Sequence, residues 1–232
     1  MSDRALADWT PPAAPVRAVH QGRFARLEPL TLEHVPGLRE AHLEDRKDAM
    51  WHYLPIGPFD TTGYSEWVEA NCTLADPLHF AVRMADGRLG GTLSLMRITP
   101  SAGTIETGWL TFAPRLQRTR EATEAVYLLM KWAFEAGYRR FEWKCDAANM
   151  PSRRAAERFG FSYEGVFRQA GVVNGRNRDT AWFAAIDSEW PVLREAYQSW
   201  LDDTNFDIDG RQIRSLGEWT GTVLVSTDPT RV

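Results

Sequence analysis

A short polar stretch in the middle of the chain has the composition of an anion-binding site. The run Pro114–Thr123 (PRLQRTREAT) follows a strand-like segment and leads into a segment with helical periodicity. The first turn of a helix carries backbone N–H groups without intrahelical partners, and the helix dipole makes that end positive. Arg118 and Arg120 add two cationic side chains. The stretch therefore favours a phosphate or pyrophosphate ligand. On its own, it also fits an ordinary helix start with exposed arginines.

A second candidate region is the aromatic segment Ala49–Thr62 (AMWHYLPIGPFDTT), which the Pro and Gly residues predict to be a loop. Its rings, with those of Trp67 and Trp109, could wall an apolar slot for a ligand. Packing between the first helices and the sheet is the alternative. His52 is a candidate base because the unperturbed pKa of imidazole is about 6.5, although a surface histidine is the simpler interpretation. The candidate ligand-contacting residues are Trp51, His52, Tyr53 and Trp109.

These regions lie within an expected series of strands and helices. Alternating apolar and polar residues predict strands at Arg23–Leu30, Leu78–Met84, Leu89–Ile98, Thr104–Phe112, Arg139–Cys145, Phe161–Gln169 and Asp179–Ile186. Helical periodicity predicts helices after Thr31, over Gly63–Leu74, from the polar stretch to Gly137, over Asn149–Phe159 and over Pro191–Leu201. Short turns join the three strands before Pro114 into an antiparallel meander, and a helix crossover then joins two strands. The pattern predicts an α+β fold with a mixed, mostly antiparallel sheet.

Composition excludes several functional classes. The chain has 232 residues, a net charge of -4 and dispersed basic residues, which argues against a nucleic-acid partner. No apolar run is long enough to span a membrane, and the N-terminus has no apolar core of a secretory signal. Cys72 and Cys145 form no CxxC pair, so we expect neither a metal site nor a disulfide, and a reducing cytoplasm fits best. We expect a small or peptide substrate and a monomer or homodimer.

Three regions are expected along the chain. Residues 1–21 form a lead-in that is poorly ordered or docked on the surface, and residues 22–188 form the main domain. Residues 189–232 form a C-terminal helix and a polar tail without a strong period.

Several motifs in this order resemble the GNAT superfamily of N-acetyltransferases, and within it the RimJ/RimL-like branch. Gln117-x-x-Arg120-x-Ala122 is similar to the Q/R-x-x-G-x-G/A motif that cradles the coenzyme A pyrophosphate. Glu106–Trp109 (ETGW) resembles the E-x-G-[YW] segment of the preceding strand, and Asn149–Ser152 (NMPS) resembles N-x-x-S of RimJ/RimL-type enzymes. The later Glu157–Phe161 (ERFGF), Glu164-Gly165 and Asn174-Gly175 extend the second match, and the resemblance covers roughly Arg23 to Ile186.

The resemblance implies the GNAT fold, with a strand-loop-helix that binds coenzyme A, and transfer of acetyl from acetyl-CoA to a primary amine. It implies direct attack of the amine within a ternary complex. The residues that it assigns to the acetyl-CoA site are Gln117, Arg118, Thr119, Arg120, Glu121, Ala122 and Thr123 for the pyrophosphate and Asn149 for the pantetheine arm. A helix N-cap is the alternative role for Asn149.

The chain departs from the family pattern at three positions. Arg120 stands where the superfamily has a Gly, and we expect its side chain to lie on the phosphate. Ala156 replaces a Tyr that commonly serves as the general acid, and Gln169-Ala170-Gly171 lacks the Glu that follows Q-A in the RimL-like pattern. The resemblance leaves Ser152 as the candidate acid, with an exposed helix residue as the alternative.

Glu106 is the first candidate for the general base, through a water if needed, and His52 is the second. A structural carboxylate paired with an arginine is the alternative role for Glu106. At pH 7, deprotonation of a lysine amine costs roughly 4.6 kcal/mol, whereas an α-amine costs only about 1 to 1.4 kcal/mol. A site without an obvious strong base therefore favours an α-amine. This agrees with the RimJ/RimL resemblance, whose named members modify N-terminal amines of ribosomal proteins.

The sequence leaves other functions open. A small-molecule amine is an alternative acceptor, and another acyl-CoA, such as succinyl-CoA, is an alternative donor. The three departures from the pattern also fit a catalytically silent module that binds coenzyme A. A β-rich binding module that binds no coenzyme A is a further alternative.

Overall fold

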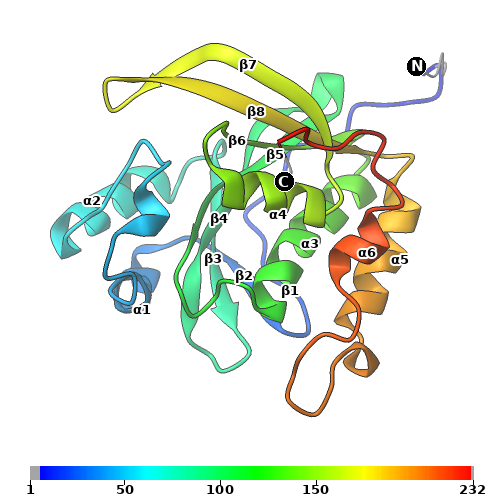
Figure 1. Cartoon of the computed structure of the whole chain (residues 1–232). Coiled ribbons are helices and arrows are strands. Elements are labelled where there is room, and N and C mark those ends of the chain that lie inside the picture. Colours follow the sequence, from blue (N-terminus) through cyan, green and yellow to red (C-terminus); the bar gives the residue numbers. More distant parts are fainter. Residues whose placement is uncertain (1–5, 231–232) are drawn as a thin grey trace.

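An eight-stranded sheet organises the chain, whose residues 6–230 are described by the computed structural model (Figure 1). The strand order is β1-β2-β3-β4-β5-β6-β8-β7. Only β5 and β6 run parallel, and the other neighbouring pairs are antiparallel. The mixed sheet confirms the predicted fold class. The strands are β1 (His20–Gln21), β2 (Ala25–Pro29), β3 (Leu78–Met84), β4 (Leu89–Thr99), β5 (Thr104–Phe112), β6 (Arg140–Asp146), β7 (Ser162–Val173) and β8 (Arg176–Ile186).

Helices cover both faces of this sheet. The larger core packs α3, α4, α5 and α6 against one face, and a smaller core packs α1, α2 and η2 against the other. On β3, Phe80 and Val82 belong to the larger core, whereas Ala81 between them belongs to the smaller core. This alternation is expected for a strand with both faces covered. The helices are α1 (Val35–His42), α2 (Thr61–Asn71), α3 (Arg120–Glu135), α4 (Met150–Arg158), α5 (Trp190–Leu201) and α6 (Leu216–Thr220), with 3-10 turns η1 (Leu32–His34), η2 (Ala49–Trp51), η3 (Pro100–Ala102) and η4 (Asp203–Asn205).

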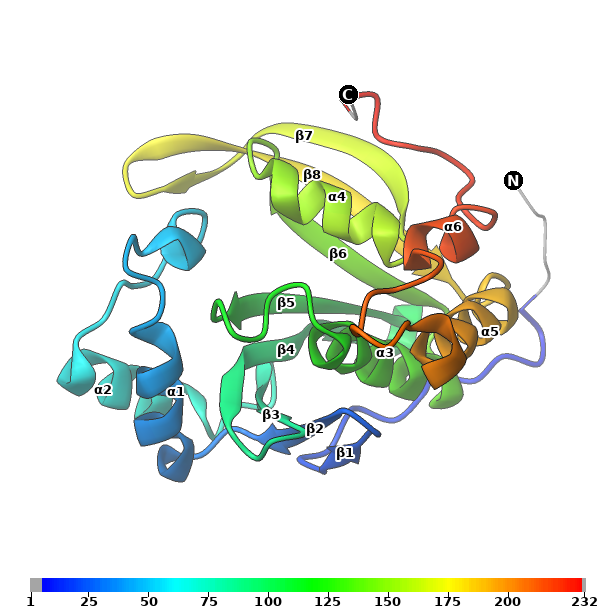
Figure 2. The same ribbon diagram turned by 60° about the horizontal axis from the view of Figure 1, so that its bottom comes forward.

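The parallel pair of strands opens into a fork. Thr104–Thr107 of β5 pair with Arg140–Trp143 of β6, and the described ladder ends there. Beyond Thr107 the two strands diverge, as Figure 2 shows. Helix α3 follows β5 and helix α4 follows β6, so both helices begin at the open end of the fork.

A bulge distorts β5 just past the fork. Ser94 of β4 lies opposite Gly108, but Thr92 lies opposite Thr111, so β5 carries an extra residue here. Trp109 takes a left-handed backbone conformation with φ of 52°. Such a conformation is uncommon for a bulky residue and is concentrated at functional sites. The bulge therefore indicates a functional site at the open end of the fork.

The β7–β8 hairpin is longer than predicted. Its strands run to Val173 and from Arg176, whereas the sequence pattern ends one strand at Gln169 and begins the other at Asp179. Between Phe167 and Gly171 the register shifts, and Gln169 has a φ of 51°. This bulge interrupts the alternation of the sequence, which explains the early end of the predicted strand.

The described part of the lead-in is docked on the domain. The Trp9 indole donates to the carbonyl of Gly137, and the Tyr138 hydroxyl donates to the carbonyl of Ala13. Residues 1–5, which belong to the same predicted lead-in, lie outside the described residues. Within the described chain, no helix combines the length and the apolar character needed to cross a bilayer.

The C-terminal segment forms a strap over α4, visible in Figure 1 as the red chain beyond α6. The backbone N–H of Val225 donates to Ser162 Oγ at the start of β7. Further on, the Asp228 carboxylate accepts two hydrogen bonds from the Arg153 guanidinium of α4, at 2.5 and 2.7 Å. The backbone N–H of Asp228 donates to Glu157, one helical turn along α4. The strap thus fixes the helix that carries Ser152.

Candidate functional site

The start of α3, residues 117–123, has the local structure of an anion-binding helix end, and we call it the anion cradle. Thr119 caps the helix, and its Oγ1 accepts a hydrogen bond from the Ala122 N–H at 3.1 Å. Arg118 before it has a φ of 63°, which turns the chain sharply into the helix. The Gln117 side chain donates to the Phe112 carbonyl and closes the loop behind the cap. First-turn N–H groups and the positive helix end fit a phosphate group here.

Arg120 is held by the C-terminal segment. Its guanidinium lies 3.3 Å from the centre of the Phe206 ring and forms a 3.1 Å ion pair with Asp203. The structure therefore places this side chain against η4 and the residue that follows it, whereas the sequence analysis expects it to lie on the phosphate. The contribution of the Arg120 backbone N–H to a phosphate site stays a prediction.

A cation that the sequence analysis missed lies beside the cradle. Arg158, at the end of α4, donates to Thr123 Oγ1 of α3 at 3.3 Å and lies over the Trp200 ring at 5.0 Å. Burial lowers the pKa of its guanidinium, and among residues 6–230 no ion pair neutralises it. Its position in the Glu157–Phe161 motif was a signal that could have singled it out.

Ser152 lies on the same face of the sheet, at the start of α4. Asn149 caps that helix by accepting from the Ser152 N–H at 3.1 Å. The Trp143 indole of β6 donates to Ser152 Oγ at 3.0 Å. Because an indole N–H can only donate, Ser152 accepts this bond and keeps its own proton for another acceptor. The N-cap role of Asn149 is confirmed, and its predicted contact with the pantetheine arm stays a prediction.

A buried polar atom at the fork fits a ligand on this face. Thr107 is the last residue of β5 paired with β6, and its Oγ1 is buried without a hydrogen-bond partner among the described residues. Buried hydroxyl groups are normally bonded. An acyl-CoA whose phosphates lie on the α3 cradle would place polar atoms within this fork, so the residues present fit the donor that the sequence implies.

Glu106 lies on the opposite face, in a network of charges. Only 2% of the residue is exposed, and its carboxylate contacts Arg97 Nη1 at 2.7 Å and Lys144 Nζ at 2.9 Å. Burial raises the pKa of this carboxyl despite the two cations. Lys144 also contacts Glu142 at 2.6 Å and lies 3.8 Å from the centre of the Trp182 ring. The neighbour Ile105 points into the larger core. Glu106 and Ser152 therefore approach the fork from its two sides.

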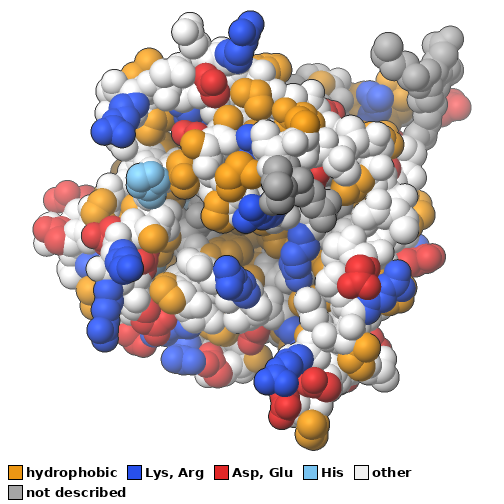
Figure 3. Space-filling view, in the orientation of Figure 1, with side chains coloured by type: hydrophobic (Ala, Val, Ile, Leu, Met, Phe, Trp, Pro, Cys, Tyr) orange, Lys and Arg blue, Asp and Glu red, His pale blue; other side chains and the backbone are white. Residues whose placement is uncertain are grey.

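A cavity of about 450 Å³ opens beside Glu106. The α1–α2 loop, β5 and the β7–β8 hairpin supply its walls, and aromatic and aliphatic side chains predominate over a few cations. Figure 3 shows the other side of the fork, where apolar side chains lie in a hollow just below the position of α4 in Figure 1, with Lys and Arg side chains at its border. The polar and aromatic side chains of the lining include Tyr53, Arg97, Glu106, Trp109, Lys144, Arg178 and Trp182.

Two of the four predicted ligand-contacting residues line this cavity. Tyr53 and Trp109 do so, and the Tyr53 hydroxyl donates to the Ala148 carbonyl just before α4. Trp51 is instead buried in the smaller core, against His42 and Phe59, which corrects the expectation that it contacts a ligand. Its ring packs between the first helices because Gly57 leaves room for it. His52 is exposed, lies edge-on to Tyr53 and is not among the lining residues.

Comparison with known proteins shows which family has this fold and this fork between two parallel strands. A family model described as "Acetyltransferase (GNAT) domain" matches residues 25–162. A solved structure of a GCN5-related N-acetyltransferase from Brucella melitensis is 45% identical, with a TM-score of 0.90 over 92% of this chain and 99% of that one.

The chain belongs to the GNAT acetyltransferase family.

Other solved structures are similar to this chain. A probable GNAT-family acetyltransferase from Chromobacterium violaceum ATCC 12472 is 40% identical, with a TM-score of 0.76 over 82% of this chain and 97% of that one. RimL, an α-N-protein acetyltransferase of a ribosomal protein, is 23% identical, with a TM-score of 0.63 over 77% of this chain and 99% of that one, a likeness in fold. A comparison with curated proteins found no match.

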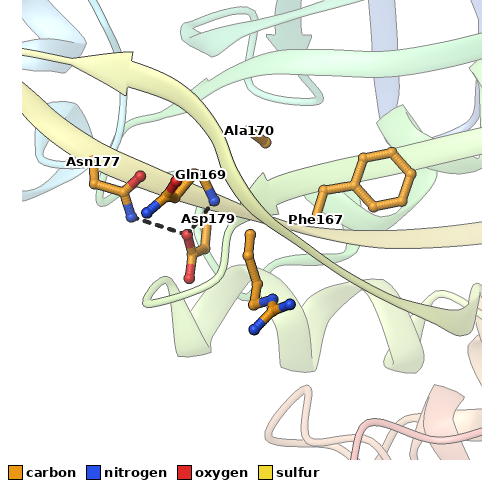
Figure 4. Close-up of a pocket in the computed structure, with 6 residues that line it drawn as sticks. Phe167, Gln169, Ala170, Asn177 and Asp179 are labelled. Carbon is orange, nitrogen blue, oxygen red and sulfur yellow. Dashed lines mark hydrogen bonds between the residues drawn. The ribbon is translucent and has the colours of Figure 1, made fainter.

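The hairpin of this acetyltransferase lines a second pocket, which is more open to solvent and is shown in Figure 4. Asp179 accepts hydrogen bonds from the Gln169 N–H at 2.7 Å and from the Asn177 side chain at 2.9 Å. These bonds fix the bulge of β7 and lower the pKa of Asp179. The carboxylate is thus used in holding the hairpin.

Metal ligands are not grouped in the described part of the acetyltransferase, where no cluster of three or more His, Cys, Asp or Glu side chains could hold an ion. His79 lies between Trp67 and Trp109, and both of its nitrogens lack hydrogen-bond partners among the described residues. Burial lowers the pKa of its imidazole to about 4. This ring is neutral at pH 7 and supports Trp109 by packing.

Proposed function

We propose that this GNAT enzyme transfers the acetyl group of acetyl-CoA to the α-amine at the N-terminus of a peptide or protein. The observation that carries the proposal is the two-sided fork between β5 and β6. The anion cradle, Ser152 and the buried Thr107 hydroxyl lie on one side, and the cavity with Glu106 lies on the other. An acyl donor and an amine can therefore meet through the opening by direct attack.

The residues of one side would hold acetyl-CoA, which supplies the activated acetyl thioester. The N–H groups from Gln117 to Thr123 would bind the pyrophosphate, and Asn149 would bind the pantetheine arm. Arg158 offers a further cation beside the cradle. Burying a guanidinium without an anionic partner is unfavourable, so a phosphate group of the donor is its natural complement.

Ser152 is the proposed proton donor to the leaving sulfur. Its hydroxyl accepts from Trp143 and lies in the first turn of α4, where the positive end of the helix stabilises negative charge. Cys145 lies close enough to bond this hydroxyl, and burial raises the pKa of its thiol to about 11. The thiol is therefore protonated at pH 7, which supports direct attack by the amine over an acyl-cysteine route.

Glu106 is the proposed base for the amine proton. A carboxyl with a raised pKa accepts a proton near neutral pH more readily than an exposed carboxyl does. Because the cations Arg97 and Lys144 oppose the rise in the pKa of this carboxyl, Glu106 is a moderate base. It suits an α-amine, whose deprotonation at pH 7 costs only about 1 to 1.4 kcal/mol.

An acceptor screen tests the proposal. Purified protein is incubated with acetyl-CoA and short peptides of varied N-terminal residue, beside polyamines and amino-acid derivatives. We expect thiol release and a mass increase of one acetyl group at the peptide α-amine. Glu106→Gln should lower the rate at least about tenfold, whereas Glu33→Gln, at an exposed position, should not. Thiol release without acetylation of any amine would favour the catalytically silent interpretation.

A small-molecule amine is the second candidate acceptor. The observation that favours it is the size of the cavity, about 450 Å³, which lies in the range of small-molecule sites. Turnover of small amines with no turnover of any peptide would replace the first proposal by this one.

A further inference from the structure

The cavity beside Glu106 contains an arginine that has no ion-pair partner among residues 6–230. Arg178, Thr180 and Trp182 alternate along β8 and line the cavity. The other two cations of the lining, Arg97 and Lys144, contact carboxylates as described above. Among residues 6–230 no ion pair joins Arg178 to a carboxylate, and its Nε is buried without a hydrogen-bond acceptor. A partly buried guanidinium in this state is complemented by an anion.

A second donor in the same lining also has no acceptor among the described residues. The indole Nε1 of Trp182 is buried without a partner. Both Trp182 and Arg178 can only donate hydrogen bonds. Burying a hydrogen-bond donor away from water costs free energy unless an acceptor bonds to it. The cavity therefore suits a ligand rich in oxygen acceptors, such as a peptide backbone that carries a carboxylate.

The register of the sheet sets the spacing between the amine and this carboxylate. Trp182 lies opposite Lys144 in the β6–β8 ladder, and Lys144 Nζ lies 2.9 Å from the Glu106 carboxylate. Arg178 lies four residues away from Trp182 on the same strand, or about 13 Å at ~3.3 Å per residue. This is a separation between backbone positions along β8, and it exceeds the amine-to-carboxylate distance of a free α-amino acid. An extended peptide covers about 3.3–3.6 Å per residue, so it spans the gap within its first few residues.

We propose that Arg178 binds the carboxylate of an Asp or Glu side chain at the second to fourth position of the acceptor peptide, while the α-amine lies beside Glu106. The acceptor is then the N-terminus of an acidic segment. This inference rests on the proposed function and names its substrate class. Trp182 donates to a backbone carbonyl between the two ends, and the apolar wall contacts the intervening side chains.

A positional scan of matched peptides tests the inference. The peptides have amidated C-termini and neutral residues, with one Glu or one Gln at the second, third or fourth position. With wild-type enzyme, kcat/KM for the best Glu peptide should exceed that of its Gln twin by about tenfold or more. Arg178→Gln should abolish most of this preference, so that kcat/KM for each Glu peptide falls to about that of its Gln twin. The matched control is Arg194→Gln, which removes an exposed cation on α5. It should retain the preference.

The outcomes separate this inference from the proposed function. Equal rates for Glu and Gln peptides in the wild-type enzyme would overturn the acidic-segment inference and leave peptide acetylation standing. Acetylation of no peptide would contradict the proposed function. In that case, the affinity of the same peptides, measured by calorimetry in the presence of coenzyme A, tests the acidic-segment inference independently of turnover. Binding selective for Glu in wild-type protein and lost in Arg178→Gln supports it, and unselective or undetectable binding overturns it.

Discussion

The ion pair between the strap and α4 gives a prediction whose magnitude follows from burial. Arg153 is 5% exposed and Asp228 is 4% exposed, and two charge-assisted hydrogen bonds join them. Asp228→Asn keeps the shape of the side chain but leaves the Arg153 charge without a counter-ion. Breaking a buried pair in this way costs about 3–5 kcal/mol of unfolding free energy. For a chain of this length, a loss of about 3 kcal/mol lowers Tm by roughly 6–12 °C.

The assay is chemical denaturation of the full-length chain, with thermal unfolding as a second measure. Asp228→Asn, Arg153→Met and the double variant complete a cycle that isolates the coupling between the two charges. Asp209→Asn is the matched control, because its pair with Arg211 spans 3.6 Å and the two side chains are 66% and 79% exposed. That substitution should change the unfolding free energy by less than about 0.5 kcal/mol.

The double variant provides the sharpest check. Since it removes both charges, it should be less destabilised than the sum of the two single variants. A loss below about 1 kcal/mol in Asp228→Asn, or additive losses in the cycle, would show that the strap does not hold α4 through this pair.

Four further predictions concern the site. Ser152→Ala should lower kcat about a hundredfold with little change in KM for acetyl-CoA, and an unchanged rate would remove Ser152 as the acid. Arg158→Gln should raise KM for acetyl-CoA several-fold, measured by initial rates, and an unchanged KM would exclude a phosphate contact. Arg97→Gln removes a cation from Glu106 and so raises the pKa of the base further, which should move the low-pH limb of kcat/KM to higher pH; an unmoved limb would contradict Glu106 as the base. The pKa of His79 falls from 6.5 unfolded to about 4 folded, so its contribution to stability is lost as pH falls from 6.5 to 4. His79→Phe should flatten this part of the curve of unfolding free energy against pH, and an equal slope in both proteins would refute the assignment.

The local elements could be predicted where one face of the chain is buried. Residue alternation gave the bounds of β3 and β5 as the structure has them, Leu78–Met84 and Thr104–Phe112. The helix that follows the polar stretch Pro114–Thr123 was also predicted from its period, and the structure adds that Thr119 is its N-cap. The two-residue strand β1 is too short to give such a pattern.

Contacts between distant segments could not be predicted. The polar tail has no period, and its strap depends on a pair of residues 75 positions apart, Arg153 and Asp228. In the same way Lys144 resembles a surface charge in sequence, but the sheet brings it against Glu106 and Glu142. The aromatic loop allowed both packing and ligand contact, and the structure divides its residues between the two, with Trp51 packed and Tyr53 in the cavity.

The two-sided fork has a consequence for the order of kinetic steps. If acetyl-CoA and the peptide enter from opposite faces of the sheet, neither molecule closes the exit of the other. Free coenzyme A can then depart before or after the acetylated product, and either substrate can arrive first. Such an enzyme has no compulsory order of substrate binding or product release. Its two products then leave by independent routes, one from the α3 cradle and one from beneath the β7–β8 hairpin.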